Sequence, residues 1–136
     1  MSQENVEVVL RVHDAAVHFD MDAFVECCHP EVEWEENTSV YLGLRACYRG
    51  HEGVQEWFSD AILEPWSDFQ IERLDFLDAD DDHVVVDFRF AARGKTSGVE
   101  TRLRIWEVYW LGQGKITRRQ LFSTEADALK AVGLEE

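Results

Sequence analysis

Residues 19–58 read FDMDAFVECCHPEVEWEENTSVYLGLRACYRGHEGVQEWF, and this stretch decides the fold that the sequence predicts. A short helix ends at Pro30, because the residue before a proline avoids the helical region. The following residues alternate in the manner of a half-buried strand, which places Trp34 and Glu36 on one face. If Trp34 faces the core, the carboxyl group of Glu36 faces it as well. An irregular loop then runs to Arg49, and another helix begins after it.

The patterns around this stretch predict three helices followed by a meander of strands. Apolar residues at three- and four-residue spacing predict a first helix up to about Phe19 and a third helix with a buried stripe over residues 54–66. From Asp68 onwards the period becomes two, which predicts strands. These strands span residues 69–76, 84–92, 101–110 and 116–123. Thr124 caps a terminal helix that ends near Gly133. This order is an α+β pattern.

Length and composition favour a single domain over residues 1–136. The formal net charge of −15 argues against nucleic-acid binding, because phosphate contacts need clustered Lys and Arg, and it would repel an anionic membrane. Cys27 and Cys28 are adjacent in a segment predicted to be helical. Because adjacent cysteines rarely form a disulfide with one another, this arrangement favours reduced thiols. No apolar run reaches the roughly 18 residues of a membrane span, and the N-terminus has no apolar signal core. We therefore expect a cytoplasmic protein.

Gly112-Gln113-Gly114 predicts a three-residue hairpin loop that sets the register of the last two strands. In this register Tyr109 lies opposite Thr117, and Glu107 lies opposite Arg119. One face carries Glu107, Tyr109, Thr117, Arg119 and Leu121. The other face carries Trp106, Val108, Trp110, Ile116, Arg118, Gln120 and Phe122. One of the two lines a cavity, and the other forms the outer surface of the sheet.

The chain resembles the nuclear transport factor 2-like superfamily, which includes the ketosteroid isomerases and the SnoaL-like polyketide cyclases. The resemblance covers about Val6 to Leu129 and rests on the order and spacing of three motifs. These are Phe19-Asp20-Met21-Asp22-Ala23-Phe24, His29-Pro30-Glu31-Val32-Glu33-Trp34-Glu35-Glu36 and Tyr48-Arg49-Gly50-His51-Glu52-Gly53-Val54-Gln55-Glu56-Trp57-Phe58. It implies a cone in which a curved antiparallel sheet wraps around helices and encloses one small-molecule pocket.

The resemblance also implies two catalytic candidates. Glu107 falls where the isomerases place an acidic residue in their oxyanion hole and where the cyclases carry a catalytic histidine. Glu36 falls where the isomerases keep their general-base aspartate. In such a pair one ionised carboxylate takes a proton next to a carbonyl, and the other carboxyl, kept neutral by desolvation, donates to the enolate oxygen. Val12 and Leu121 replace a catalytic tyrosine of the isomerases and an acidic residue of the cyclases, so neither known set is complete.

Each candidate also has a purely structural interpretation. Arg119 would hold Glu107 ionised as a plain ion-pair partner, and Glu36 could end its strand in solvent. His13 lies on an apolar helical stripe, where a hydrogen-bonded core histidine is more common than a base.

Ligand sites are mostly apolar with few polar groups. The predicted ligand-binding residues are therefore His13, Trp34, Phe90, Tyr109 and Arg119.

Metal and cofactor binding have little support in the sequence. No metal-ligand spacing occurs, and the acidic run Asp78–Asp82 predicts a solvated turn, so we expect neither a metal nor a cofactor.

The outer sheet face with Trp106 and Trp110 is too apolar to be left bare. Superfamily members often pair sheet to sheet at this face, which leads us to predict a homodimer.

Three classes of function remain open. The first is a cofactor-independent isomerase, cyclase or hydratase that acts on a hydrophobic carbonyl compound with Glu36 as base. The second is a non-catalytic protein that binds a small hydrophobic ligand in the same pocket, and the third is a dimerisation module. The fold alone does not decide between them. The incomplete catalytic sets lower the first class, and the polar groups directed inward lower the third.

Overall fold

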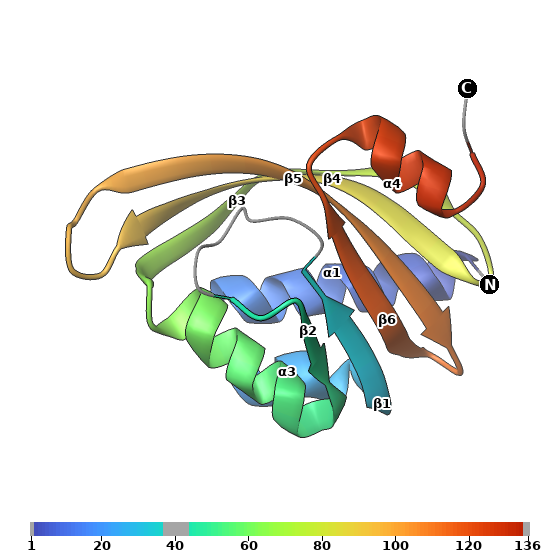
Figure 1. The fold of residues 1–136 in the computed structure, drawn as a ribbon, viewed down its shortest axis with the longest axis horizontal. Coiled ribbons are helices and arrows are strands. Elements are labelled where there is room, and N and C mark those ends of the chain that lie inside the picture. The colour runs from blue at the N-terminus through green and yellow to red at the C-terminus, as the bar shows by residue number, and fades with distance from the viewer. Residues whose placement is uncertain (1, 37–43, 135–136) are drawn as a thin grey trace.

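Six strands form one open, strongly curved sheet in the computed structural model, which describes residues 2–36 and 44–134 (Figure 1). The strands are β1 (Cys28–Glu35), β2 (Cys47–Arg49), β3 (Trp66–Ala79), β4 (His83–Gly94), β5 (Glu100–Gly112) and β6 (Lys115–Phe122). Their order across the sheet is β2-β1-β6-β5-β4-β3. Neighbours are antiparallel except β1 and β6, which are parallel. The predicted α+β fold with a curved sheet is confirmed.

The helices of the described residues cover both faces of this sheet (Figure 1). They are α1 (Ser2–Val17), α2 (Met21–Glu26), α3 (Gly50–Phe58), the π-helical turn η1 (Ser59–Leu63) and α4 (Glu125–Ala131). Helix α1 contacts β3 and β4, and α3 contacts β1, so the main core lies between the concave face and the first three helices. Helix α4 packs on the convex face against β4, β5 and β6.

Helix α2 ends earlier than the sequence predicts. It stops at Glu26, and Cys28 already begins β1, so the prediction that both cysteines lie in a helix is wrong. The carbonyl of Cys27 accepts a hydrogen bond from the backbone N–H of Ile116 (2.8 Å), which starts the pairing with β6 ahead of Pro30. The ladder is interrupted at the proline, which has no N–H to donate. Both thiols are free, and burial raises the pKa of Cys28 to about 12.

The β5–β6 hairpin has a tighter turn than the predicted three-residue loop. The turn contains two residues, Gln113 and Gly114, and both have positive φ (56° and 76°). Primed turns of this kind match the twist of the flanking strands. Thr117 is an extra residue in β6, because Trp110 pairs with Arg118 while the next residue of β5 pairs with Ile116.

This bulge changes the register that the sequence predicts. Glu107 lies opposite Leu121, and Tyr109 lies opposite Arg119, so the predicted pairing of Glu107 with Arg119 is wrong. Ile116 was predicted on the outer face but packs in the main core. The bulge restores the alternation beyond it, so the side chain of Arg119 still points to the core and reaches Glu107 diagonally.

The convex face of the sheet carries a second apolar cluster that α4 partly covers. Ala128 of α4 packs with Val85 and Val108, and half-buried Trp106 and Trp110 border this cluster. The sequence prediction of an apolar outer face is therefore correct, but part of its cover comes from the chain's own terminal helix.

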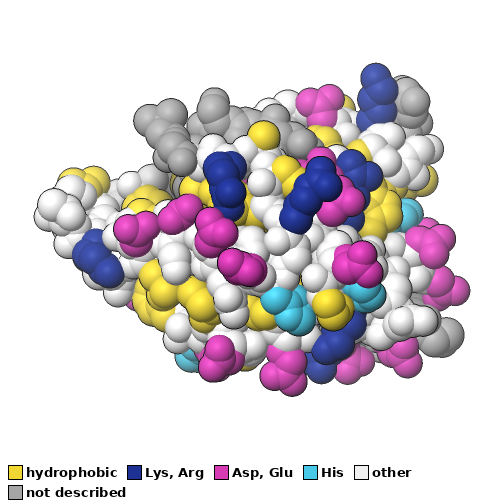
Figure 2. Space-filling view, turned by 60° about the horizontal axis from the view of Figure 1, so that its bottom comes forward, with side chains coloured by type: hydrophobic (Ala, Val, Ile, Leu, Met, Phe, Trp, Pro, Cys, Tyr) yellow, Lys and Arg dark blue, Asp and Glu magenta, His cyan; other side chains and the backbone are white. Residues whose placement is uncertain are grey.

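No helix in residues 2–36 and 44–134 is long and apolar enough to cross a membrane. On the face shown in Figure 2, acidic side chains are spread over the surface around the basic ones. The whole chain has a formal net charge of −15.

Candidate functional site

Four buried ionisable side chains form a continuous chain of contacts in the core. His13 Nε2 of α1 lies 2.9 Å from Oε1 of Glu107 in β5. Arg119 of β6 donates to Oε2 of Glu107 from Nε (2.9 Å) and Nη2 (2.7 Å), and to Oε1 of Glu36 from Nη1 (2.8 Å). All four side chains are at most 5% exposed. Arg119 therefore bridges two carboxylates that lie far apart in the sequence.

Two neutral donors add further hydrogen bonds to these carboxylates. The Tyr109 hydroxyl donates to Oε2 of Glu107 (2.8 Å), and the Trp57 indole Nε1 donates to Oε1 of Glu36 (2.6 Å). Buried charges are tolerated only when they are paired and hydrogen-bonded in this way. The network thus gives the carboxylates of Glu36 and Glu107 the Arg119 guanidinium and one neutral donor each.

The charges around Glu107 keep it ionised. Burial alone would raise the pKa of Glu107, but the Arg119 guanidinium and His13 outweigh burial and lower it to about 2. Although burial opposes it, the carboxylates of Glu36 and Glu107 raise the pKa of Arg119. Burial and the charge of Glu107 raise the pKa of Tyr109. Glu107 is an ion-pair partner of Arg119, and its lowered pKa is opposite to that of a neutral carboxyl donor.

Both ring nitrogens of His13 face oxygen acceptors. Nδ1 lies 2.8 Å from the carbonyl oxygen of Val9, and Nε2 faces the carboxylate of Glu107. The His13 ring therefore joins the backbone of α1 to the carboxyl group of Glu107.

A cavity of about 30 Å³ lies beside this network, between the sheet and the first helices. Its walls are mainly apolar and aromatic, and a polar end is formed by His13, Glu107, Tyr109 and Arg119. Small-molecule sites have this composition, but they measure about 300–1,000 Å³. The cavity as it stands is large enough for about one water molecule.

The structure brings most of the predicted ligand-binding residues to this cavity. His13, Trp34, Tyr109 and Arg119 line it. Phe90 does not, because its ring stacks on another core phenylalanine (4.8 Å between centroids) and fills the adjacent apolar core.

The two catalytic candidates differ in their access to the cavity. Glu107 lines it, whereas Glu36 contacts Arg119 and Trp57 and is not part of the lining. Glu36 is buried on the same face as Trp34, as the alternation of β1 predicts. Its Oε1 has two donors, and its Oε2 has no hydrogen-bond partner among the described residues.

Sequence patterns predict no functional role for Trp57, which lies only within the predicted buried stripe of the third helix. A signal was present, since a buried indole needs an acceptor for its N–H. Which acceptor it finds depends on the packing of α3 against β1, and the sequence pattern does not specify this packing.

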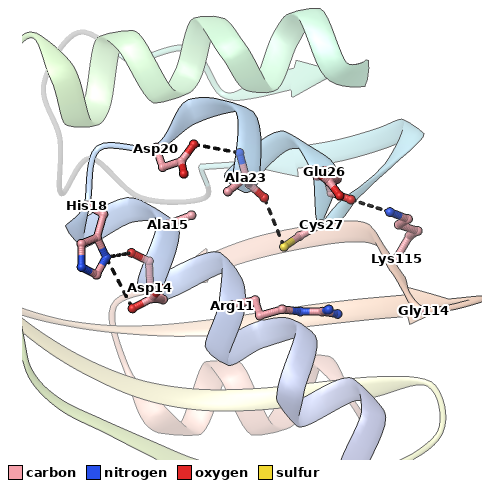
Figure 3. A pocket seen from close by; sticks show the side chains of 10 residues that line it. All are labelled: Arg11, Asp14, Ala15, His18, Asp20, Ala23, Glu26, Cys27, Gly114 and Lys115. Atoms are coloured by element: carbon pink, nitrogen blue, oxygen red, sulfur yellow. Dashed lines mark hydrogen bonds and ion pairs between the residues drawn. The ribbon is translucent and has the colours of Figure 1, made fainter.

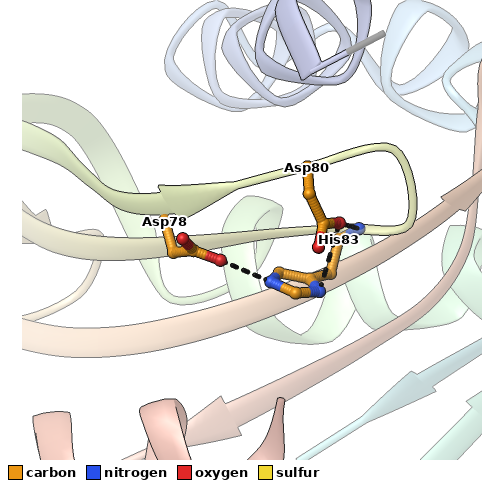
Figure 4. Close-up of side chains that lie close together, drawn as sticks. All are labelled: Asp78, Asp80 and His83. Carbon is orange, nitrogen blue, oxygen red and sulfur yellow. Dashed lines mark hydrogen bonds and ion pairs between the residues drawn. The ribbon is translucent and has the colours of Figure 1, made fainter. Parts of the chain in front are cut away.

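A second cluster, Asp78, Asp80 and His83, lies at the β3–β4 turn (Figure 4). Its potential metal-ligating atoms lie within 4.8 Å of one another. The histidine already faces a carboxylate with each ring nitrogen, Nε2 with Asp78 (2.6 Å) and Nδ1 with Asp80 (3.3 Å). Oδ1 of Asp80 also accepts two backbone N–H groups of the turn. The cluster is therefore best explained as side-chain contacts that close the turn.

A surface groove of about 420 Å³ lies between α1, α2 and the β5–β6 turn (Figure 3). This volume is within the range of ligand sites, about 300–1,000 Å³. The lining carries charges of both signs, Arg11 and Lys115 beside Asp14, Asp20 and Glu26. Such a lining selects neither an anion nor a cation, so the internal cavity is the better supported site.

The fold places the chain among α+β proteins in which a curved sheet packs on helices, with a cavity between them in the described residues. The sequence profile of the SnoaL-like domain family matches residues 9–119, and the chain belongs to this family. Its structural neighbours are nuclear transport factor 2-like and ketosteroid isomerase-like proteins. No curated protein sequence matches the chain.

Three solved structures illustrate the similarity in fold. TerC co-crystallized with polyporic acid has a TM-score of 0.75 at 22% identity, covering 93% of this chain and 98% of TerC. A protein from Mycobacterium tuberculosis in complex with estradiol-17beta-hemisuccinate has a TM-score of 0.72 at 16% identity, covering 92% and 96%. A protein from Xanthomonas campestris pv. campestris assigned as a polyketide cyclase has a TM-score of 0.75 at 15% identity, covering 97% and 98%.

Proposed function

We propose that this protein binds a small, largely apolar molecule in the internal cavity. The observation that carries the proposal is the composition of the cavity, in which aromatic walls meet a buried polar end of His13, Glu107, Tyr109 and Arg119. Burying a group of charges is unfavourable, so a cavity beside such a group is better explained by a binding role than by imperfect packing. The small organic ligands in two structures of the same fold support this assignment.

Binding requires the cavity to enlarge. Its volume is about 30 Å³, whereas a cavity that takes up benzene measures on the order of 150 Å³. Side chains of the aromatic wall must therefore move when a ligand enters. The population of this wider state multiplies the affinity, so the apparent dissociation constant is larger than that of a preformed site.

Filling the cavity from α1 is expected to weaken ligand binding. Ala16 lines the internal cavity, whereas Ala15, its neighbour in the same helix, lines the surface groove. We expect Ala16→Val to raise the dissociation constant by about tenfold or more, because each tenfold change corresponds to only about 1.4 kcal/mol. Ala15→Val should leave it unchanged. Calorimetric titration with polyporic acid and small aromatic ketones measures both, and loss of binding in Ala15→Val alone would place the ligand in the groove.

A second candidate function is an acid–base reaction on an apolar carbonyl compound. The observation that favours it is the buried Glu36 Oε2, which has no partner among the described residues and is therefore the carboxylate atom free to accept a proton. Glu107 would hold His13 and Arg119 in place and supply negative charge, since its pKa is too low for a proton donor. Glu36 would need ligand-induced access to the cavity.

Replacement of Glu36 by glutamine separates catalysis from binding. If Glu36 is the base, Glu36→Gln abolishes turnover of a bound carbonyl compound. Turnover is measured as the rate of proton exchange at the carbon next to the carbonyl. The dissociation constant should change little, because the amide keeps the shape of the side chain. Exchange at an undiminished rate in this variant would remove Glu36 from the mechanism.

We also propose that the protein forms a homodimer through the convex face of the sheet. Trp106 and Trp110 stay half-buried at the border of the α4 cluster and offer apolar area for a second copy. We expect sedimentation at micromolar concentration to give twice the monomer mass of 15.8 kDa, and Trp110→Glu to shift it towards the monomer. A monomeric wild type would exclude this interface.

A further inference from the structure

The indole N–H of Trp34 is a buried donor without a hydrogen-bond partner among the described residues. The residue is 1% exposed and lines the internal cavity. The other buried side-chain atoms without a partner in these residues belong to side chains that do not line this cavity. Buried polar atoms are nearly always paired, so an unpaired one calls for an explanation such as a ligand.

Contacts on several sides restrict the ring that carries this donor. The Trp34 ring lies 5.3 Å from Phe24, 5.1 Å from Trp57 and 6.0 Å from Tyr109, measured between ring centroids. The Arg119 guanidinium carbon lies 4.9 Å from the Trp34 ring centroid. These contacts restrict the Trp34 ring, and its unpaired N–H belongs to a residue that lines the cavity, where an acceptor on a ligand can meet it.

The other side-chain nitrogens and the tyrosine hydroxyl of the cavity lining already have partners in the protein. His13 uses both ring nitrogens, the Tyr109 hydroxyl donates to Glu107, and each nitrogen of the Arg119 guanidinium contacts a carboxylate. Among the side-chain nitrogens that line the cavity in the described residues, Trp34 Nε1 is the one without a hydrogen-bond partner. Because two buried carboxyl groups, Glu36 and Glu107, already belong to this network, an anionic acceptor would bring a further negative charge into the core, which is unfavourable.

We infer that Trp34 selects ligands by donating its indole N–H to an uncharged carbonyl oxygen. This inference rests on the proposed binding function and adds the chemical group that the ligand must present. An apolar molecule of the same shape without this oxygen leaves the N–H unpaired in the complex, and it therefore binds less tightly.

A matched pair of ligands tests this selection. Acetophenone and α-methylstyrene have nearly the same shape, and only the first has a carbonyl oxygen. Calorimetric titration of the wild type should give about 3- to 10-fold tighter binding of acetophenone, the range expected for one neutral hydrogen bond. The preference should disappear in Trp34→Phe. It should persist in Trp57→Phe, which changes the same cavity wall but removes an N–H already donated to Glu36.

A second substitution keeps the shape of the ring. Introducing β-(3-benzothienyl)alanine at position 34 replaces only the N–H by sulfur, so a loss of preference cannot come from altered packing. Two results would overturn this inference and leave the proposed function standing. One is equal binding of the two compounds to the wild type, and the other is a preference for acetophenone that survives both substitutions of Trp34. Failure of both compounds and of the other cavity ligands to bind overturns the proposed function itself.

Discussion

Arg119→Met is expected to lower the free energy of unfolding by about 3–5 kcal/mol, the cost of removing one partner from a buried ion pair. The guanidinium is the shared partner of Glu36 and Glu107, and it is 1% exposed. Without it the two buried carboxylates lose the positive charge that offsets most of their own charge. Methionine fills a similar volume, so the loss reports charge rather than a cavity. Urea unfolding followed by tryptophan fluorescence measures it.

Arg118 offers a matched control one residue away. It also pairs with a glutamate, Glu35, but its side chain is 44% exposed. Solvent screens such a pair, and Arg118→Met should therefore cost at most about 1 kcal/mol. The double substitution of Arg119→Met with Glu107→Gln should recover part of the stability, because it removes one of the stranded charges. Equal effects at positions 118 and 119 would show that the buried network is not a major source of stability.

The second large effect is a loss of stability in acid that depends on Glu107. Its folded-state pKa of about 2 lies below the ordinary value of 4.5. A lowered pKa stabilises the folded state at pH values above the ordinary pKa, and this contribution is lost as the pH falls from about 4.5 towards 2. The difference corresponds to a contribution on the order of 3 kcal/mol. Unfolding free energies measured between pH 6 and pH 2 should fall accordingly.

The variant Glu107→Gln identifies the source of this acid sensitivity. It is less stable near neutral pH, because Arg119 and His13 lose their carboxylate. Its stability should, however, fall less steeply with acid than that of the wild type, since the titrating group is gone. Parallel curves for the two proteins would mean that other carboxylates account for the acid unfolding.

Local periodicity was sufficient to predict the α+β class and one side of the site, whereas the curved sheet around helices was implied by the family resemblance. The period of two in β1 places Trp34 and Glu36 on the same buried face, and the alternation in β5 does the same for Glu107 and Tyr109. These faces follow from each strand alone, because side chains alternate whatever the neighbouring strand. The contact between Glu107 and Arg119 was also predicted, although from an incorrect register.

The features that the sequence did not predict depend on contacts between elements. Two loop lengths fit Gly112-Gln113-Gly114, and only the structure shows the two-residue turn with its compensating bulge at Thr117. The contact of Trp57 with Glu36 depends on how α3 packs against β1. The exclusion of Phe90 from the cavity likewise depends on the packing of neighbouring aromatic rings.

The location of the bound ligand tests the central claim most directly. The chain has five tryptophans, and of these Trp34 and Trp57 line the internal cavity while Trp106 and Trp110 lie on the convex face. A heteronuclear NMR titration with acetophenone therefore reports the site through the indole N–H signals. The account predicts that the signals of Trp34 and Trp57 shift with ligand concentration and that those of Trp106 and Trp110 stay in place. Shifts confined to the convex-face tryptophans, or no shift at saturating ligand, would contradict it.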